Sequence, residues 1–331
     1  MGSATSTPTS DTSPAAQVVD LDTGFDDLYA RVLVPALAPH EAERRRLLMQ
    51  ALLSLLGTLA AVVIGAVVAT MIWHNPRITL AAGALPLFGG GWFVSGRLKR
   101  FAASCKEEAL TRLADALGLS YDPDADAYGV ARLQELALLP DFEQSNYQDQ
   151  FTGSEQGCAF RLYEARMQVK RGSGNTEHWI TVFNGQIILI DFPRPFAGTT
   201  VINRHSLFGA RHPGLEQIHL ESGQFERSFE CYGSDQVGAR ELVHPVFMER
   251  LNGLEAALGG KRLRCAFDGG KLMVIVEGGD LFDIVKVFRQ IPDRDAVRRG
   301  VEGIDHLLKL IRVILAPPDN PYADDPVSPA A

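Results

Sequence analysis

The sequence lacks an excess of positive charge. Its 331 residues include 40 Asp and Glu against 32 Lys and Arg, giving a formal net charge of -8. This balance opposes nonspecific nucleic-acid binding, which depends on neutralising phosphates with Lys and Arg. The soluble part contains no basic cluster that would offset it. We therefore expect no nucleic-acid partner.

Cysteine is also scarce. The four cysteines lie far apart and form no C-x-x-C pair, which excludes a zinc ribbon or a thioredoxin-like motif; they are Cys105, Cys158, Cys231 and Cys265. Two of them stand among apolar or aromatic neighbours typical of strands. The pattern predicts buried free thiols in a reducing compartment.

Familiar catalytic signatures are missing too. The chain has no G-x-S-x-G, no H-E-x-x-H and no P-loop. His205, His212 and His219 lie seven residues apart, with Glu216 between two of them. Such spacing is weak support for a metal site, because loop ligands can have any spacing. We therefore predict no catalytic, cofactor-binding or metal-binding residue.

Two long uncharged stretches lie near the N-terminus. Residues 47–73 carry no charge and are long enough to cross a bilayer core. A polar break follows, and residues 78–96 form a shorter second stretch that contains Pro86. A buried hairpin in a soluble protein or a cleaved signal peptide would be the alternatives, but the runs are too long, and the first begins too late for a signal. The sequence predicts a two-helix transmembrane hairpin.

Basic residues flank this hairpin on one side. The predicted membrane-flanking residues are Arg44, Arg45, Arg46, Arg97, Lys99 and Arg100. The connection between the spans offers only Arg77. Positive charge stays in the cytoplasm, so we expect both termini and the soluble domain there. Small residues at Ala61, Gly65 and Ala69 favour close helix packing, either within the hairpin or between copies in a homo-oligomer.

The rest of the chain divides by composition. Residues 1–20 and 317–331 are predicted to be disordered tails. Residues 21–46 predict a short amphipathic juxtamembrane segment, with a helix ended by Pro35 that lies either on the membrane or on the soluble domain. Residues 97–155 predict a helical stalk and connector. Residues 156–316 predict an α+β soluble domain, an antiparallel sheet covered by helices, because strand-like segments begin after about residue 160 without βαβ alternation.

Local signals within this domain are clear in three places. Asn184-Gly185 between two apolar β-prone runs predicts a type I′ hairpin turn. A second hairpin is expected around residues 268–270, and strands at 199–203, 217–220 and 225–232. The last helix, from about 293 to 315, carries an apolar stripe. That stripe packs on the sheet or on a partner helix, and the sequence leaves both open.

Two stretches resemble a known family. They are FNGQIILIDFPRPFAGTTVI at 183–202 and FERSFECYGSDQVGARELVHPVFMERL at 225–251. Together they are similar to an uncharacterised bacterial membrane-protein family, domain of unknown function 3137, whose members carry a similar N-terminal hydrophobic hairpin. Here Gly238 and His244 replace the usual acidic residue and Thr. The resemblance implies a bacterial inner-membrane location and transfers no activity.

Two groups of polar residues are candidates for function. Asp235, Gln236 and Arg240 form a polar corner, where Asp235 is expected to cap a helix and a ligand-binding role is the alternative. Arg194, Arg204 and Arg211 are candidate contacts for anionic headgroups. The leading hypothesis is a membrane-anchored interaction or scaffold module with an unknown protein partner. The alternatives are an anionic-lipid-headgroup-binding domain and an enzyme with an unrecognised site.

Overall fold

The computed structural model describes residues 21–73, 76–204, 212, 214–257, 262–286 and 288–316. Both predicted tails lie outside these ranges. The chain begins with α1 (Leu21–Leu28), a π-helical turn (Tyr29–Leu33) and two long helices, α2 (Val34–Trp73) and α3 (Pro76–Ala116). The shorter helices are α4 (Val130–Glu135), α5 (Gly223–Ser228), α6 (Gln236–Leu242) and α7 (Pro245–Ala257), and the last is α8 (Arg294–Leu315).

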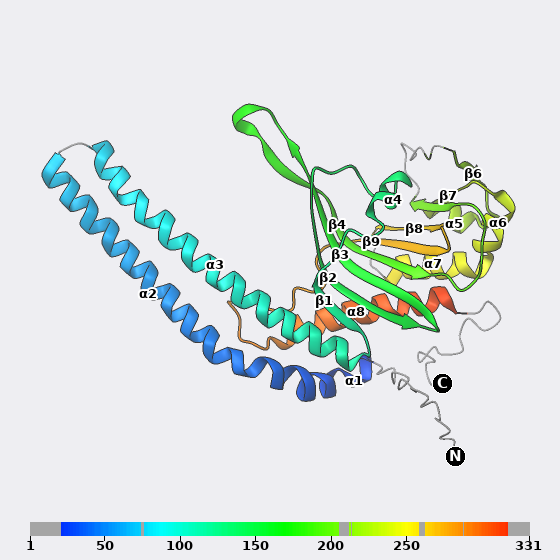
Figure 1. The fold of residues 1–331 in the computed structure, drawn as a ribbon, viewed down its shortest axis with the longest axis horizontal. Helices are drawn as coiled ribbons and strands as arrows, with labels where there is room; N and C mark the ends of the chain where they lie inside the picture. The colour runs from blue at the N-terminus through cyan, green and yellow to red at the C-terminus, as the bar shows by residue number, and fades with distance from the viewer. Residues whose placement is uncertain are drawn as a thin grey trace, which may run out of the picture.

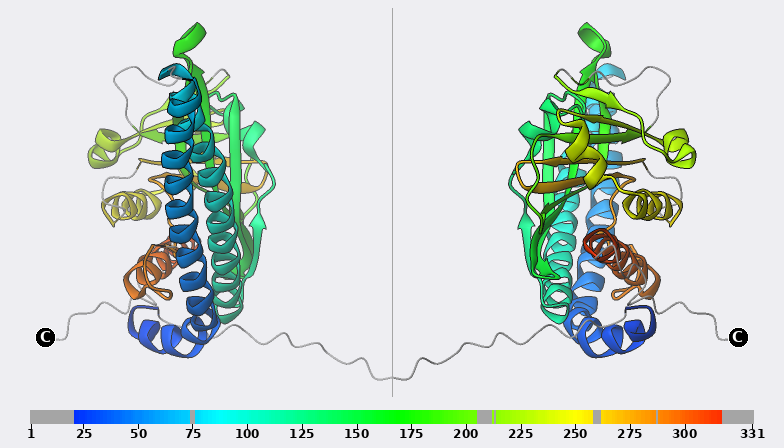
Figure 2. Two further views of the ribbon diagram at one scale, coloured as in Figure 1. Left: turned by 90° about the vertical axis from the view of Figure 1, so that its left-hand side faces the viewer. Right: turned by 90° about the vertical axis from the view of Figure 1, so that its right-hand side faces the viewer.

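The helices α2 and α3 lie side by side and project together away from the rest of the protein (Figures 1 and 2). Within the described residues, one helical stretch, Gly24–Gly65, is long and apolar enough to cross a bilayer. Its apolar side chains, such as Leu53 and Ile64, are exposed. Exposure of this kind along the part of α2 that carries no charge, from residue 47 onward, supports a membrane anchor. The side chains of residues 72–94 lie outside the description.

Nine strands form one antiparallel sheet in the order β1-β2-β3-β4-β9-β8-β5-β7-β6. The first half comprises β1 (Ser120–Asp124), β2 (Gln144–Glu155), β3 (Cys158–Arg171) and β4 (His178–Asp191). The second half comprises β5 (Thr200–Arg204), β6 (Glu216–Ile218), β7 (Phe229–Gly233), β8 (Arg262–Asp268) and β9 (Lys271–Glu277). The expected α+β class with a large antiparallel sheet is confirmed. The sheet begins before residue 160, because β1 and β2 precede the segment where strand patterning is clear.

The predicted hairpin at Asn184-Gly185 is wrong. Both residues lie inside β4, and the actual turn joins β3 to β4 at residues 172–177. Gly185 is needed for a close approach instead: a Cβ there would lie 2.2 Å from the carbonyl oxygen of Val276 on β9. The backbone N–H groups of Gly278 and Gly279 both donate to the carbonyl of Asn184. The Asn-Gly pair therefore lies where the pairing of β4 with β9 ends and the chain after β9 crosses close over β4.

Two further local predictions need correction. Pro35 does not end the N-terminal helix: the π-helical turn Tyr29–Leu33 precedes it, and the chain continues as α2 from Val34 to Trp73. This segment packs on the soluble domain, with Phe25 and Leu28 buried. The strand expected at 225–232 begins only at Phe229, because Ser222 caps the short helix α5 by accepting from the backbone of Phe225.

The core lies on both faces of the sheet. One face packs against α8 and the inner ends of α2 and α3, and the other packs beneath α4 and the segment after it. The apolar stripe of α8, including Val301, Ile304 and Leu308, is buried, so it faces the protein's own core rather than a partner. Asp293 caps this helix, accepting from the N–H groups of Asp295 and Ala296.

Candidate functional site

Charged side chains from separate elements meet where α3 reaches the sheet. Lys106 of α3 donates to Asp149 of β2 at 2.6 Å, and the Tyr121 hydroxyl of β1 donates to the other Asp149 oxygen at 2.8 Å. Glu164 of β3 and Asp280, after β9, complete the group. One carboxylate oxygen from each of Asp149, Glu164 and Asp280 lies within 4.8 Å of the others. We call these three acids and Lys106 the acidic junction.

Local backbone geometry directs Asp149 into this junction. The pairing of β2 with β3 shifts register between Gln148 and Phe151, and Asp149 has a φ of 55°. A bulge of this kind leaves one residue unpaired and re-aims its side chain. Aspartate tolerates positive φ better than most residues. As a result the carboxylate is buried against Lys106 rather than pointing into solvent.

Glu164 is buried in the junction, with only 4% of the residue exposed. One of its oxygens accepts from the backbone N–H of Leu281 at 2.7 Å and from the Gln186 amide at 3.0 Å. The Gln186 amide also donates to the carbonyl of Gly279 at 2.7 Å. The second Glu164 oxygen is buried without a hydrogen-bond partner. An ionised carboxylate is costly in that position.

The electrostatics of the junction favour a bound proton. Burial and the neighbouring Asp280 carboxyl raise the pKa of Glu164 to about 8, against lowering by its two N–H donors. Burial also raises the pKa of Asp149, outweighing the attraction of Lys106. Burial lowers the pKa of Lys106, but the nearby carboxylates raise it by more. The pKa of Lys106 is therefore above its ordinary value, and the lysine stays charged. A neutral Glu164 can donate its proton toward Asp280 and relieve the repulsion between two carboxylates.

Asp149, Glu164 and Asp280 are also the described residues that could together hold a metal ion. Their oxygens suit a hard cation such as Mg²⁺ or Ca²⁺. Both Asp149 oxygens, however, already accept from Lys106 and Tyr121. The arrangement therefore fits a proton on Glu164 better than an ion shared by three carboxylates.

The predicted polar corner is a helix cap. Asp235 precedes α6 and accepts from the N–H of Val237 at 3.0 Å. Arg240 donates to the carbonyl of Gln236 at 3.2 Å, and the Gln236 amide donates to Glu216 at 3.0 Å. These bonds fix α6 against β6 at the surface.

The described residues do not bring the three candidate headgroup arginines into one site. The Arg194 guanidinium lies 5.8 Å from the centre of the Phe192 ring, and Arg204 is exposed at the end of β5. Arg211 lies outside the described residues.

The membrane-flanking basic residues are better placed for a shared role. His40 of α2 hydrogen-bonds to Glu108 of α3 at 2.8 Å, which sets the two antiparallel helices side by side. The His40 ring also lies 6.2 Å from the Phe101 ring of α3, so residues 44–46 of α2 lie within about one helical turn of the level of residues 97–100.

Sequence reasoning missed the acidic junction. Its acids are far apart in the chain, in no recognisable spacing. The one local signal was Glu164 itself, a charged residue inside the strand-like stretch FRLYEARMQV. Of the three histidines, His212 is buried and lies 2.9 Å from the Asn203 amide nitrogen, whereas His205 lies outside the described residues.

An open groove of about 610 Å³ lies between α7 and the segment that begins α5. Its lining includes Glu221, Gln224, Met248 and Glu249. Two glutamates beside an apolar methionine give this groove a negative rim and a partly apolar wall.

Comparison with known proteins gives a family match over part of the chain and no activity. The family described as "Protein of unknown function (DUF3137)" matches residues 181–315, from β4 through α8, which confirms the resemblance found in the sequence. No curated protein matches the chain. One solved structure, the crystal structure of the mycobacterial trehalose monomycolate transport factor A, TtfA, aligns with a TM-score of 0.36 and 10% identity. The alignment covers 64% of this chain and 97% of that one, and its score is too low to support any inference.

Proposed function

We propose that this protein is a membrane-anchored interaction module, in which α2 and α3 cross the bilayer as a hairpin and hold a cytoplasmic domain against it for a protein partner. One observation carries the proposal: both long helices are rooted in the core of the soluble domain. On α3, the side chains of Cys105, Ala109, Leu110 and Leu113 are fully buried. On α2, Leu37 is buried as well.

Continuity between the two parts supports this proposal. The helix α3 is unbroken from Pro76 to Ala116, so the uncharged stretch and the buried root belong to one rigid element. Burying Leu110 and Leu113 alone stabilises the attachment by roughly 3 to 6 kcal/mol, at about 1.5 to 3 kcal/mol for each large apolar side chain. The flanking arginines and lysines favour the cytoplasmic side for the domain.

Reporter fusions test the anchor. We expect an enzymatic reporter placed after Trp73 to signal from outside the cytoplasm, and the same reporter placed after Arg100 to signal from inside. The physical reason is the basic residues at the inner ends of both helices. A cytoplasmic signal after Trp73 would overturn the two-span arrangement.

The groove beside α7 is the surface we assign to the protein partner. Its glutamates suit a basic segment, and its methionine offers an adaptable apolar contact. Gln224 lines this groove, whereas Gln144 is an equally exposed glutamine on β2, away from it. The two positions form a matched pair for site-specific photocrosslinking in intact membranes.

We expect a photoreactive residue at position 224 to yield a discrete adduct that position 144 does not yield. The double change Glu221→Gln and Glu249→Gln should weaken that adduct roughly thirtyfold, since two charge pairs at about 1 kcal/mol each contribute about 2 kcal/mol together. Equal adducts at both positions, or none at position 224, would contradict a partner at the groove.

A further inference from the structure

The loop between β9 and α8, residues 278–293, carries an unusually exposed aromatic side chain. Phe288 is 82% exposed. Exposed cations stand on either side of it, at Lys286 and Arg289. An exposed phenylalanine side chain is costly in water. At a membrane interface it is favoured when cations flank it, because the ring enters the boundary of the acyl chains while the cations stay among the headgroups.

Two hydrogen bonds fix the level of this loop against the N-terminal helical segment. The backbone N–H of Ile291 donates to Glu41 at 3.1 Å, and the Tyr29 hydroxyl donates to the carbonyl of Pro292 at 3.3 Å. Glu41 lies six residues before the uncharged stretch begins, a rise of about 9 Å along the helix. That distance is comparable to the thickness of one headgroup layer. Phe288 is three residues from Ile291, so the loop stands at the expected bilayer surface.

A second apolar tip rises on the same side of the domain. The β3–β4 hairpin extends beyond its neighbours, because β2 pairs with β3 only as far as Gln168 and β9 pairs with β4 only from Gly185. In Figures 1 and 2 this hairpin projects toward the side where the far ends of α2 and α3 lie. Near its tip Trp179 is 46% exposed and Ile180 is 41% exposed.

The hairpin tip repeats the chemistry of the loop. Lys170 lies opposite Trp179, and Arg171 lies opposite His178, in the antiparallel register. Lys170 pairs with Glu177, so the tip carries two cations and one anion. Tryptophan favours the boundary between hydrocarbon and headgroups, and a positive balance suits an anionic leaflet.

We propose that the soluble domain rests on the anionic bilayer surface through two contacts, Phe288 of the loop and Trp179 with Ile180 of the hairpin. The inference rests on the proposed membrane anchor and adds to it a docked orientation. The docked orientation uses different residues from Arg194, Arg204 and Arg211. Its determinants are two apolar tips with cationic neighbours: the loop that is held at the level of Glu41, and the hairpin that projects along the anchor.

Fluorescence quenching by brominated lipids tests this contact in the full chain. With Trp73→Phe and Trp92→Phe, Trp179 is the single indole left, and the protein is reconstituted in phosphatidylcholine and phosphatidylglycerol vesicles. Bromine at shallow acyl positions should quench Trp179 roughly twofold, because an interfacial indole lies beside those carbons. A second reporter combines Trp179→Phe with Phe288→Trp in the same background and should be quenched similarly.

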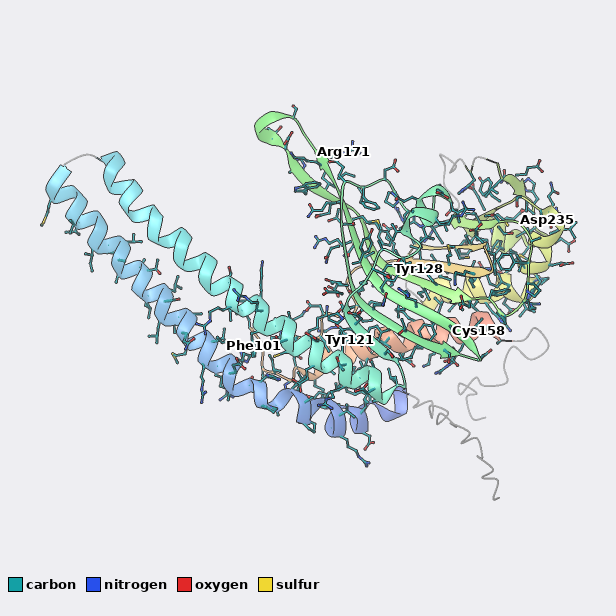
Figure 3. The ribbon with its side chains drawn as sticks, viewed as in Figure 1. Phe101, Tyr121, Tyr128, Cys158, Arg171 and Asp235 are labelled. Atoms are coloured by element: carbon teal, nitrogen blue, oxygen red, sulfur yellow. The ribbon has the colours of Figure 1, made fainter. Side chains whose placement is uncertain are left out.

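The control reporter is Tyr128→Trp in the background that lacks all three native tryptophans. Tyr128 is 47% exposed, similar to Trp179, and lies on the body of the domain away from the helices (Figure 3). Its quenching should be unaffected by bromination. Replacing phosphatidylglycerol with phosphatidylcholine, or introducing Lys170→Gln with Arg171→Gln, should reduce quenching of Trp179.

Two outcomes overturn the proposal. One is that indoles at 179 and 288 show no more quenching than the indole at 128. The other is that they are shielded only when membrane proteins are added, which identifies a protein surface instead. Reporter fusions that still give the two-span topology would leave the anchor intact, so failure of the docked orientation is distinct from failure of the anchor.

Discussion

Replacing Gly185 with alanine is expected to lower the stability of the soluble domain by about 3 kcal/mol, at the upper end of typical overpacking costs. The added Cβ would lie 2.2 Å from the Val276 carbonyl oxygen and 2.9 Å from the Glu277 Cα. Both are backbone atoms of a paired strand, so no side-chain rotation relieves the contact. Alanine would have to push β4 and β9 apart beside the bond from Gln186 to Gly279.

Thermal unfolding of the purified full chain measures this effect. A loss of about 3 kcal/mol corresponds to a decrease in Tm of roughly 5 to 10 °C for a domain of this size. Gly253→Ala is the matched control, because Gly253 lies in α7 and a Cβ there meets open space. Alanine is the better helix former, so this control should leave Tm unchanged or slightly raised. Equal Tm values for the two variants would contradict the close approach at Gly185.

The second large effect concerns pH and Glu164. Its pKa in the folded protein, about 8, is above its ordinary value of 4.5, so the folded chain holds a proton that the unfolded chain releases. Its contribution to stability is therefore complete below about pH 4.5 and is lost as pH rises to about 8. The slope of that loss is at most about 1.4 kcal/mol per pH unit.

Glu164→Gln should remove this slope. A glutamine keeps the oxygen that accepts from Leu281 and Gln186, and its amide can donate toward Asp280 as the protonated acid does. The Tm of the variant should therefore exceed that of the wild type above pH 8 and approach it near pH 5. The difference between the two curves isolates Glu164 from other titrating groups, such as His212, whose pKa is lowered by burial.

Glu107→Gln is the control for this measurement. Glu107 is exposed on α3, next to Lys106 in sequence, and its replacement should leave the wild-type pH slope unchanged. If the plot of Tm against pH for Glu164→Gln runs parallel to that of the wild type, Glu164 does not hold a buried proton at the junction. A rise in wild-type Tm on adding Mg²⁺ or Ca²⁺, abolished by Glu164→Gln, would show that a cation neutralises the acids instead.

Patterns with a single physical cause were predictable from sequence. Asp293 and the periodic apolar positions after it fix α8 almost to the residue, because capping and burial are both local. The turn at Gly269-Gly270 was also predictable from a local requirement, because both residues have a positive φ, which glycine adopts without strain. His244 shows how a departure can keep a role, since its Nδ1 accepts from the N–H of Phe247, as a threonine hydroxyl would.

Features that depend on distant partners were missed or misjudged. Asn184-Gly185 has the composition of a turn, but the reason for its glycine is a strand almost one hundred residues later. Likewise, the acidic junction joins residues of α3, β2, β3 and the loop after β9, which no spacing in the sequence brings together. The helix α5 replaced an expected strand because Ser222 and Glu226 offer their side chains to nearby backbone N–H groups.

In the proposed membrane anchor, the unbroken helix α3 from Pro76 to Ala116 also limits the volume through which the domain can move. A domain on a flexible tether samples a hemisphere whose radius grows with linker length, and it meets partners at an effective concentration set by that volume. A domain on a rigid helical post samples almost no volume and has a fixed height and facing direction. In the proposed arrangement, partners would reach the domain by lateral diffusion in the membrane or by approaching within one domain's breadth of the surface. Part of the orientational entropy of binding is then already lost before the partner arrives.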